Sequence, residues 1–146
     1  MAEACRERHI LVVDDNPGDV RLVREAFGSE RVDREIETVA NGDDALRYLR
    51  REGRYAGRPR PDLILLDLNL PGTDGRQVLT EIKADRGLLQ IPVVVMSSSS
   101  AEDDVAFCYE RHANCYIPKA HDFDAWREII GAIDRFWLDT VMLPTA

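Results

Sequence analysis

The 146 residues of this chain fit one domain of ordinary size, because single domains cluster at roughly 100–150 residues. The composition is 45% hydrophobic and 32% charged, and no apolar tract approaches the about 20 residues that span a bilayer. The net charge of −8 argues against direct nucleic-acid binding, which needs Lys and Arg in excess on one face. Residues 1–8 are polar and do not resemble a secretion signal, so we expect a cytoplasmic protein without membrane or nucleic-acid partners.

Five short apolar runs predict the strands of a mostly parallel sheet. In chain order they are residues 10–13, 35–39, 63–66, 93–96 and 115–117, of which the second and fifth are weaker. The three strong runs are continuous and rich in Val, Ile and Leu, as expected for strands covered by helices on both faces. Helical segments alternate with these runs, which indicates repeated βα units and an α/β fold.

Residues between the runs predict where helices begin. Asn16 and Pro17 supply an N-cap acceptor and a proline at the first helical position. Ser100, with an acidic residue three positions later, predicts the cap of another helix. The last helix, about residues 123–139, has an apolar stripe at three-and-four spacing, which predicts that one face packs on the sheet.

Acidic residues follow two strands at the point where each strand ends. Asp14 and Asp15 come directly after the first strand, and Asp67 directly after the third. Ligands of open α/β sheets bind at this edge, so the three carboxylates would share one crevice if the two strands were neighbours. Two such charges about 4 Å apart repel by about 4 kcal/mol at an effective dielectric of 20, and Mg²⁺ is a natural counter-ion. Taken alone, the alternative that Asp14 and Asp15 merely cap a helix is about equally strong.

Ser97 and Lys119 end the fourth and fifth strands and therefore reach the same edge. Each has an ordinary structural explanation, since serine often caps a helix and lysine is usually a solvated surface residue. Their coincidence with Asp67 at the ends of the strands favours a functional site.

Five motifs together carry a resemblance to a known family. They are Ile-Leu-Val-Val-Asp-Asp-Asn at 10–16, Asp-Leu-Ile-Leu-Leu-Asp-Leu-Asn-Leu-Pro-Gly at 62–72, Asp-Gly at 74–75, Pro-Val-Val-Val-Met-Ser at 92–97 and Tyr-Ile-Pro-Lys at 116–119. The chain resembles the receiver domain of two-component response regulators over residues 9–139. The resemblance implies a flavodoxin-like, doubly wound parallel sheet of five strands in the order 2-1-3-4-5 with five helices. A polar segment, residues 1–8, and an apolar tail, residues 140–146, would flank this domain.

The resemblance also implies a role for each acidic residue. Asp67 corresponds to the phosphoacceptor. Asp14, Asp15 and Asp67, with the backbone carbonyl of Asn69, correspond to the ligands of Mg²⁺, for which Mn²⁺ is a second candidate.

Three further residues correspond to the catalytic and switching groups of the family. Ser97 would turn its hydroxyl toward the phosphoryl group, Lys119 would pair with it, and the inward or outward position of Tyr116 would report the state. Family members usually place proline after the lysine, whereas here Pro118 precedes Lys119 and Ala120 follows it. A cis bond before a residue other than proline costs about 2.5–4 kcal/mol, so the geometry of the Lys119–Ala120 peptide is left open.

The implied function is a stand-alone response regulator that a sensor histidine kinase phosphorylates, with a bacteriophytochrome as a candidate kinase. It would signal by conformational switching and catalyse only its own phosphorylation and slow dephosphorylation. A phosphorelay intermediate and a pseudo-receiver binding module are the alternatives. The second is disfavoured by the presence of Asp14, Asp15, Asp67, Ser97 and Lys119. A phosphatase of the haloacid-dehalogenase type needs Asp-x-Asp, and the second acid is replaced here by Asn69.

The C-terminal segment is more apolar than a monomer normally leaves exposed. It contains Trp137, Val141, Met142 and Leu143 and resembles the tails of single-domain regulators paired with bacterial phytochromes. We therefore predict a homodimer formed through the fourth and fifth helices and this tail. The alternative is a tail that folds back over its own core.

Overall fold

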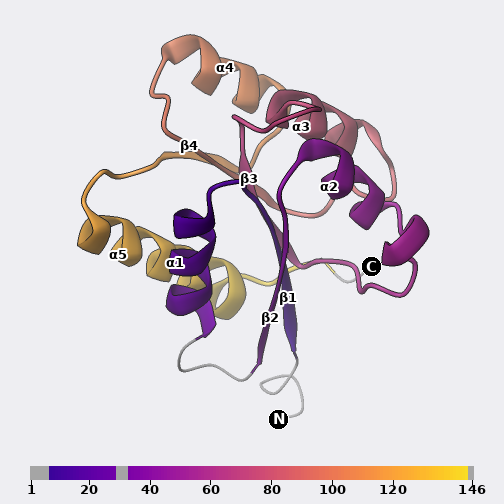
Figure 1. Cartoon of the computed structure of the whole chain (residues 1–146), viewed down its shortest axis with the longest axis horizontal. Coiled ribbons are helices and arrows are strands. Elements are labelled where there is room, and N and C mark those ends of the chain that lie inside the picture. Colours follow the sequence, from indigo (N-terminus) through magenta and orange to yellow (C-terminus); the bar gives the residue numbers. More distant parts are fainter. Residues whose placement is uncertain (1–6, 29–32, 145–146) are drawn as a thin grey trace.

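A computed structural model describes residues 7–28 and 33–144 of the chain (Figure 1). Five parallel strands form one sheet in the order β2-β1-β3-β4-β5, as predicted. The strands are β1 (Arg8–Val13), β2 (Arg34–Val39), β3 (Leu63–Asp67), β4 (Val93–Ser97) and β5 (Cys115–Pro118). The helices are α1 (Pro17–Gly28), α2 (Gly42–Leu49), α3 (Gly75–Ala84), α4 (Glu102–Glu110) and α5 (Phe123–Asp134), with a short 3-10 helix at Gly53–Tyr55 and a π-helix at Arg135–Thr140.

Helices cover both faces of the sheet, with α1 and α5 on one face and α2, α3 and α4 on the other (Figure 1). Side chains of β1 alternate between the two cores: Leu11 and Val13 pack toward α2 and α3, whereas Ile10 and Val12 pack toward α1 and α5. Because both faces are buried, the central strands need apolar residues at every position. The edge strands β2 and β5 are half-exposed, which explains their weaker sequence signal.

The predicted helix ends are confirmed at α1 and corrected at α4. The side chain of Asn16 accepts a hydrogen bond from the backbone N–H of Asp19 at 3.1 Å, and Pro17 begins the helix. At α4 the predicted Ser100 cap is wrong, because Ala101 occupies the N-cap position without a side-chain bond. The hydroxyl of Ser99 accepts instead from the N–H of Ala101 at 3.2 Å.

The last helix changes character before it ends. The α-helix α5 stops at Asp134 and continues as the π-helix, so the single helix predicted over residues 123–139 is divided. Among the residues described, every helix is too short or too polar to cross a bilayer.

A buried arginine anchors this C-terminal region to β2. The side chain of Arg34 is 1% exposed and bonds to Asp134 at 2.7 Å, Asp139 at 2.9 Å and Asp33 at 3.0 Å. A buried charge persists only when it is paired, so these contacts fix the π-helix against the start of β2. No sequence pattern predicts this cluster, because Arg34 lies among other charged residues that are typical of a protein surface.

The tail beyond the anchor is divided between the core and the surface. Trp137 and Leu143 pack against the core beneath α1 and α5, and Leu138 is buried there. Met142 is 98% exposed and Phe136 is 51% exposed. The tail therefore folds back in part while it leaves apolar side chains on the outside.

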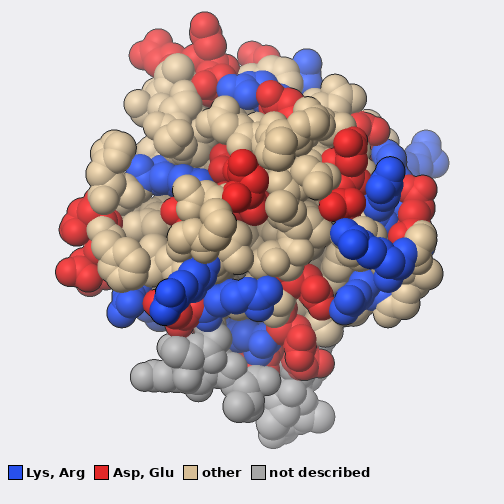
Figure 2. Space-filling model, viewed as in Figure 1, with Lys and Arg blue, Asp and Glu red and all other residues tan. Residues whose placement is uncertain are grey.

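Charged side chains of both signs are mixed over the face that Figure 2 shows. Arg50 pairs with Glu81 at 3.0 Å, and Arg58 pairs with Glu37 at 2.8 Å. These two arginines therefore serve as partners of nearby acids.

Candidate functional site

Three carboxylates meet at the carboxyl edge of the sheet. Strands β1 and β3 are direct neighbours, with Val13 opposite Leu66, so the residues that follow each strand come together. Asp14, Asp15 and Asp67 each offer a carboxylate oxygen, and these oxygens lie within 4.8 Å of one another. The cluster expected from the ends of the strands is therefore present.

The two buried carboxylates are held in the same way. One oxygen of Asp14 accepts a hydrogen bond from the backbone N–H of Asn16 at 2.9 Å, and one oxygen of Asp67 accepts from that of Asn69 at 3.1 Å. The other oxygen of each accepts from the ammonium of Lys119, at 3.1 Å for Asp14 and 3.0 Å for Asp67. Asp15 is exposed at the rim, so the cluster has two fixed members and one open to solvent.

Lys119 reaches the cluster from β5. Its backbone N–H donates to the carbonyl of Ser97 at 2.7 Å, which places it beside the end of β4. Its ammonium also donates to Asp19 on α1 at 2.7 Å, a contact that the sequence analysis missed. Burial alone would lower the pKa of Lys119, but the hydrogen bond to Asp19 and the charges of Asp14 and Asp67 outweigh it and raise that pKa. The Lys119–Ala120 bond is trans, like every peptide bond in the described parts of the chain.

Negative charge exceeds positive charge at this site. Burial raises the pKa of Asp14 from 3.8 to about 6, against the lowering effects of the Asn16 N–H and of Lys119. Four carboxylates, counting Asp19, share this site with the single ammonium found here among the described residues, and three of them contact it. Oxygen ligands with an uncompensated negative charge suit a hard divalent cation such as Mg²⁺ or Mn²⁺.

Hydrogen bonds through the β4–α4 loop connect Ser97 with Tyr116. Ser97 is fully buried at the end of β4, and its hydroxyl accepts from the N–H of Ser99 at 3.1 Å. The hydroxyl of half-buried Tyr116 donates to the carbonyl of Ser99 at 2.7 Å, so its ring lies inward. The hydroxyl of Ser99 bonds to Asp104 on α4 at 2.7 Å. Ser99 thus connects β4, β5 and α4.

Close packing after β3 explains the Asp-Gly motif at 74–75. A Cβ atom on Gly75 would lie 2.3 Å from the carbonyl oxygen of Asp67 and 2.6 Å from the Cα of Leu68. The N–H of Gly75 donates to the carbonyl of Leu68 at 3.0 Å, while Asp74 caps α3. Only glycine allows the start of α3 to approach the Asp67 backbone this closely.

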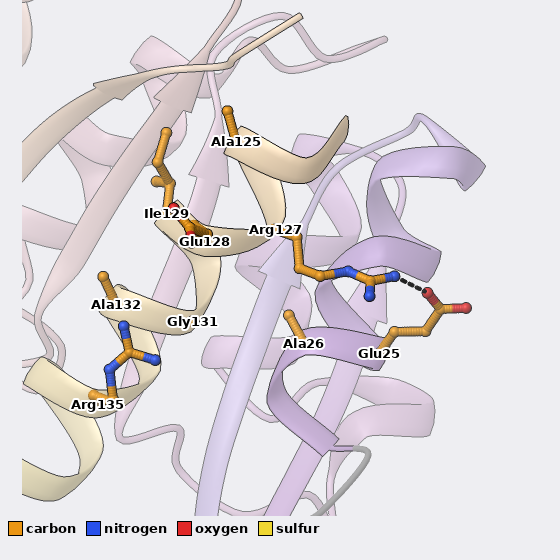
Figure 3. Close-up of a pocket in the computed structure, with 9 residues that line it drawn as sticks. All are labelled: Glu25, Ala26, Ala125, Arg127, Glu128, Ile129, Gly131, Ala132 and Arg135. Carbon is orange, nitrogen blue, oxygen red and sulfur yellow. Dashed lines mark hydrogen bonds and ion pairs between the residues drawn. The ribbon is translucent and has the colours of Figure 1, made fainter. Parts of the chain in front are cut away.

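A separate groove of about 990 Å³ lies between α1 and α5 (Figure 3). An ion pair between Arg127 and Glu25, 3.5 Å long, connects the two helices across it. None of the acidic site residues lines this groove, so it is distinct from the carboxylate cluster.

Comparison with known proteins establishes the family. The sequence profile of the response regulator receiver domain matches residues 10–131. The chain belongs to this family. The receiver is 46% identical over 137 residues to response regulator Rcp1 of Synechocystis sp., a match that covers 94% of the receiver and 93% of Rcp1.

Solved structures agree with this assignment. The receiver superimposes on the phosphorylated cyanobacterial phytochrome response regulator RcpA with a TM-score of 0.93 and 50% identity, covering 95% of the receiver and 99% of RcpA. It matches the Mn²⁺-bound form of Rcp1 with a TM-score of 0.91 and 45% identity, covering 94% and 99%. The resemblance to phytochrome-associated receivers is therefore confirmed, and the acidic cluster of this receiver fits a divalent metal. Receivers of this kind are signalling proteins that take phosphoryl groups from histidine kinases.

Proposed function

We propose that this receiver accepts a phosphoryl group from a histidine kinase on Asp67 in a Mg²⁺-dependent reaction. One observation carries the proposal: a buried Asp67 oxygen bonds to Lys119 while the same side chain lies within 4.8 Å of Asp14 and Asp15. This arrangement combines a nucleophile, a fixed cation and a ligand set for a second cation.

The reaction is a displacement on phosphorus. A carboxylate oxygen of Asp67 forms the new bond to phosphorus as the bond from the phosphohistidine nitrogen breaks, which yields an acyl phosphate. Asp14, Asp15, Asp67 and the backbone carbonyl of Asn69 would hold Mg²⁺, which neutralises charge on the phosphoryl oxygens when bound. Lys119, already fixed beside Asp67, would stabilise the same charge, because phosphoryl transfer depends mainly on positioning and electrostatics.

The Ser99 hydrogen bonds suggest how phosphorylation would be transmitted. A turn of the Ser97 hydroxyl toward new phosphoryl oxygens would move it away from the N–H of Ser99, 3.1 Å away in this state. Ser99 also bonds to Tyr116 and Asp104, so its displacement would reach β5 and α4 together. Phosphorylation would then shift the population between two packings of this loop.

The decisive experiment is labelling with a small acyl phosphate donor in Mg²⁺. Wild type and the Asp103→Asn control, which removes an exposed acid of α4, should incorporate phosphate, whereas Asp67→Asn should not. EDTA should abolish labelling of the wild type. Undiminished labelling of Asp67→Asn would contradict the proposal.

We also propose that the partner kinase is linked to a phytochrome, because RcpA is a phytochrome response regulator and shares half of its aligned residues with this chain. Phosphotransfer from a panel of purified histidine kinases would test this. Preferential transfer from a phytochrome-linked kinase is expected, and preference for another class would refute it. Onward transfer to a histidine phosphotransfer protein would instead identify a relay intermediate.

A homodimer through the tail is the last element of the proposal. Met142 and Phe136 remain outside, next to Trp137 and Leu143, which are only partly covered, and to Val141. Full burial of each large apolar side chain is worth about 1.5–3 kcal/mol, which favours a second copy as the cover of these residues. Sedimentation should show a dimer that Met142→Asp weakens, and a monomer at high concentration, with or without phosphorylation, would count against it.

A further inference from the structure

Asp19 occupies an unusual position for an acid in the first turn of a helix. An acidic side chain there ordinarily stabilises the helix dipole from the surface. The Asp19 side chain is only 26% exposed and turns toward the edge of the sheet, where its oxygen lies 2.7 Å from Lys119 Nζ. This is the shortest of the three carboxylate contacts of the ammonium, the others being 3.0 Å to Asp67 and 3.1 Å to Asp14. A dipole effect requires no such contact.

The ammonium of Lys119 and a divalent cation compete for the same carboxylates. An ammonium has three N–H donors, and the three contacts can use all of them. Two of these go to Asp14 and Asp67, which would also bind the metal. Each cation lowers the negative potential that attracts the other, so the position of the ammonium affects metal binding.

We propose that Asp19 is a positioning residue that draws the Lys119 ammonium toward α1, leaving Asp14 and Asp67 available to a divalent cation and holding the ammonium beside the incoming phosphoryl group. The proposal rests on the function proposed above for the cluster. Without the Asp19 charge, the ammonium would settle on Asp14 and Asp67 alone and oppose metal binding more strongly. The hydrogen bond that Lys119 donates to Asp19 is also the main contact that raises the pKa of Lys119.

Substitution of Asp19 by asparagine removes the charge with almost no change in shape. The affinity of the unphosphorylated protein for Mg²⁺ should fall about three- to tenfold, within the range of a partly exposed charge-assisted hydrogen bond. Asp19→Glu should restore part of the affinity, because the carboxylate returns on a longer side chain. The matched control is Glu25→Gln, which removes the same charge from the same helix at a residue paired with Arg21 and Arg127.

A double-mutant cycle separates positioning from a simple charge effect. In a Lys119→Met background the ammonium is absent, so Asp19→Asn should change Mg²⁺ affinity by less than about twofold if it acts through Lys119. An equal loss of affinity in both backgrounds would overturn the proposal and identify Asp19 as a through-space charge. An unchanged affinity in the single variant would also overturn it.

The experiment is a titration of the full chain with MgCl₂, followed by the NMR amide signals of Asp15 and Asn69. Thermal unfolding in EDTA confirms that each variant is folded. If Asp19→Asn does not fold, Asp19→Glu serves as the second variant. Failure of the function proposed for the cluster would appear differently, as a wild-type protein that does not bind Mg²⁺ or as labelling that survives in Asp67→Asn.

Discussion

Removal of the exposed acid Asp15 should make the metal-free protein more stable. Its carboxylate lies within 4.8 Å of those of Asp14 and Asp67 and is not among the contacts of Lys119. Two charges at that distance repel by about 3.5 kcal/mol at an effective dielectric of 20 and by about 0.9 kcal/mol in bulk water. Because Asp15 is exposed, the lower value applies, and two such pairs amount to about 1–2 kcal/mol.

Thermal unfolding in EDTA at low salt measures this effect. Near this chain length 1 kcal/mol corresponds to about 2–4 °C, so Asp15→Asn should raise the Tm by about 3–6 °C. The same variant should lose most of the stabilisation by Mg²⁺, which for the wild type is about 1.4 kcal/mol at ten times the dissociation constant. Glu128→Gln, which removes an exposed acid of α5, controls for net charge. A lower Tm for Asp15→Asn in EDTA, or a full response to Mg²⁺, would refute the reasoning.

Three further predictions concern protonation, the buried arginine and close packing. Asp14 has a pKa of about 6 in the folded protein, above its ordinary value of 3.8. The protonated side chain therefore stabilises the metal-free fold fully below pH 3.8, and this stabilisation is lost as the pH rises through about 6. Mg²⁺ must displace that proton, so its affinity should fall about tenfold per pH unit below pH 6, and a constant affinity from pH 5 to 7 would contradict this. Arg34→Met should lower the free energy of unfolding in urea by about 3–5 kcal/mol, because the buried cation anchors the C-terminal region; a loss under about 1 kcal/mol would count against that role. Gly75→Ala should lower the free energy of unfolding by about 1–3 kcal/mol and slow the phosphate labelling of Asp67. Gly57→Ala, whose added Cβ meets nothing within 4 Å, should do neither. Equal behaviour of the two variants would be evidence against the close approach of α3 to Asp67.

The central strands could be predicted from the sequence because their burial on both faces makes them continuous apolar runs. Periodicity alone does not determine the order of the strands, which came from the resemblance to receiver domains. The edge strands gave weaker signals because one side of each is half-exposed, as at β5. The π-helix could not be predicted, because Arg34, a hundred positions away from Asp134, anchors the region where it begins.

The acidic cluster could be predicted because ligands bind at the carboxyl ends of parallel strands, and Asp14, Asp15 and Asp67 follow two such strands. Asp19 was missed because an acid in the first turn of a helix has an ordinary explanation in the helix dipole. Its place in the first turn of the helix that directly follows Asp14 and Asp15 was the available signal. The cap of α4 was wrongly assigned to Ser100, because the course of the β4–α4 loop places Ala101, which has no side-chain acceptor, at the N-cap position.

The tail shows why the sequence alone could not distinguish two ways to bury apolar residues. Both folding back and dimerisation remove Trp137 and Leu143 from water, and the same pattern of residues predicts either. The structure places these two side chains against the core of their own chain and leaves Met142 outside. The oligomeric state therefore stays a prediction for sedimentation.

Identification of the phosphorylated residue tests the central claim most directly. The wild-type protein would be treated with an acyl phosphate donor in Mg²⁺, the acyl phosphate reduced with borohydride, and the modified residue located by peptide mass spectrometry. We predict modification of Asp67 alone, and none when EDTA replaces Mg²⁺. Modification of a different carboxylate, or equal modification in EDTA, would contradict the account.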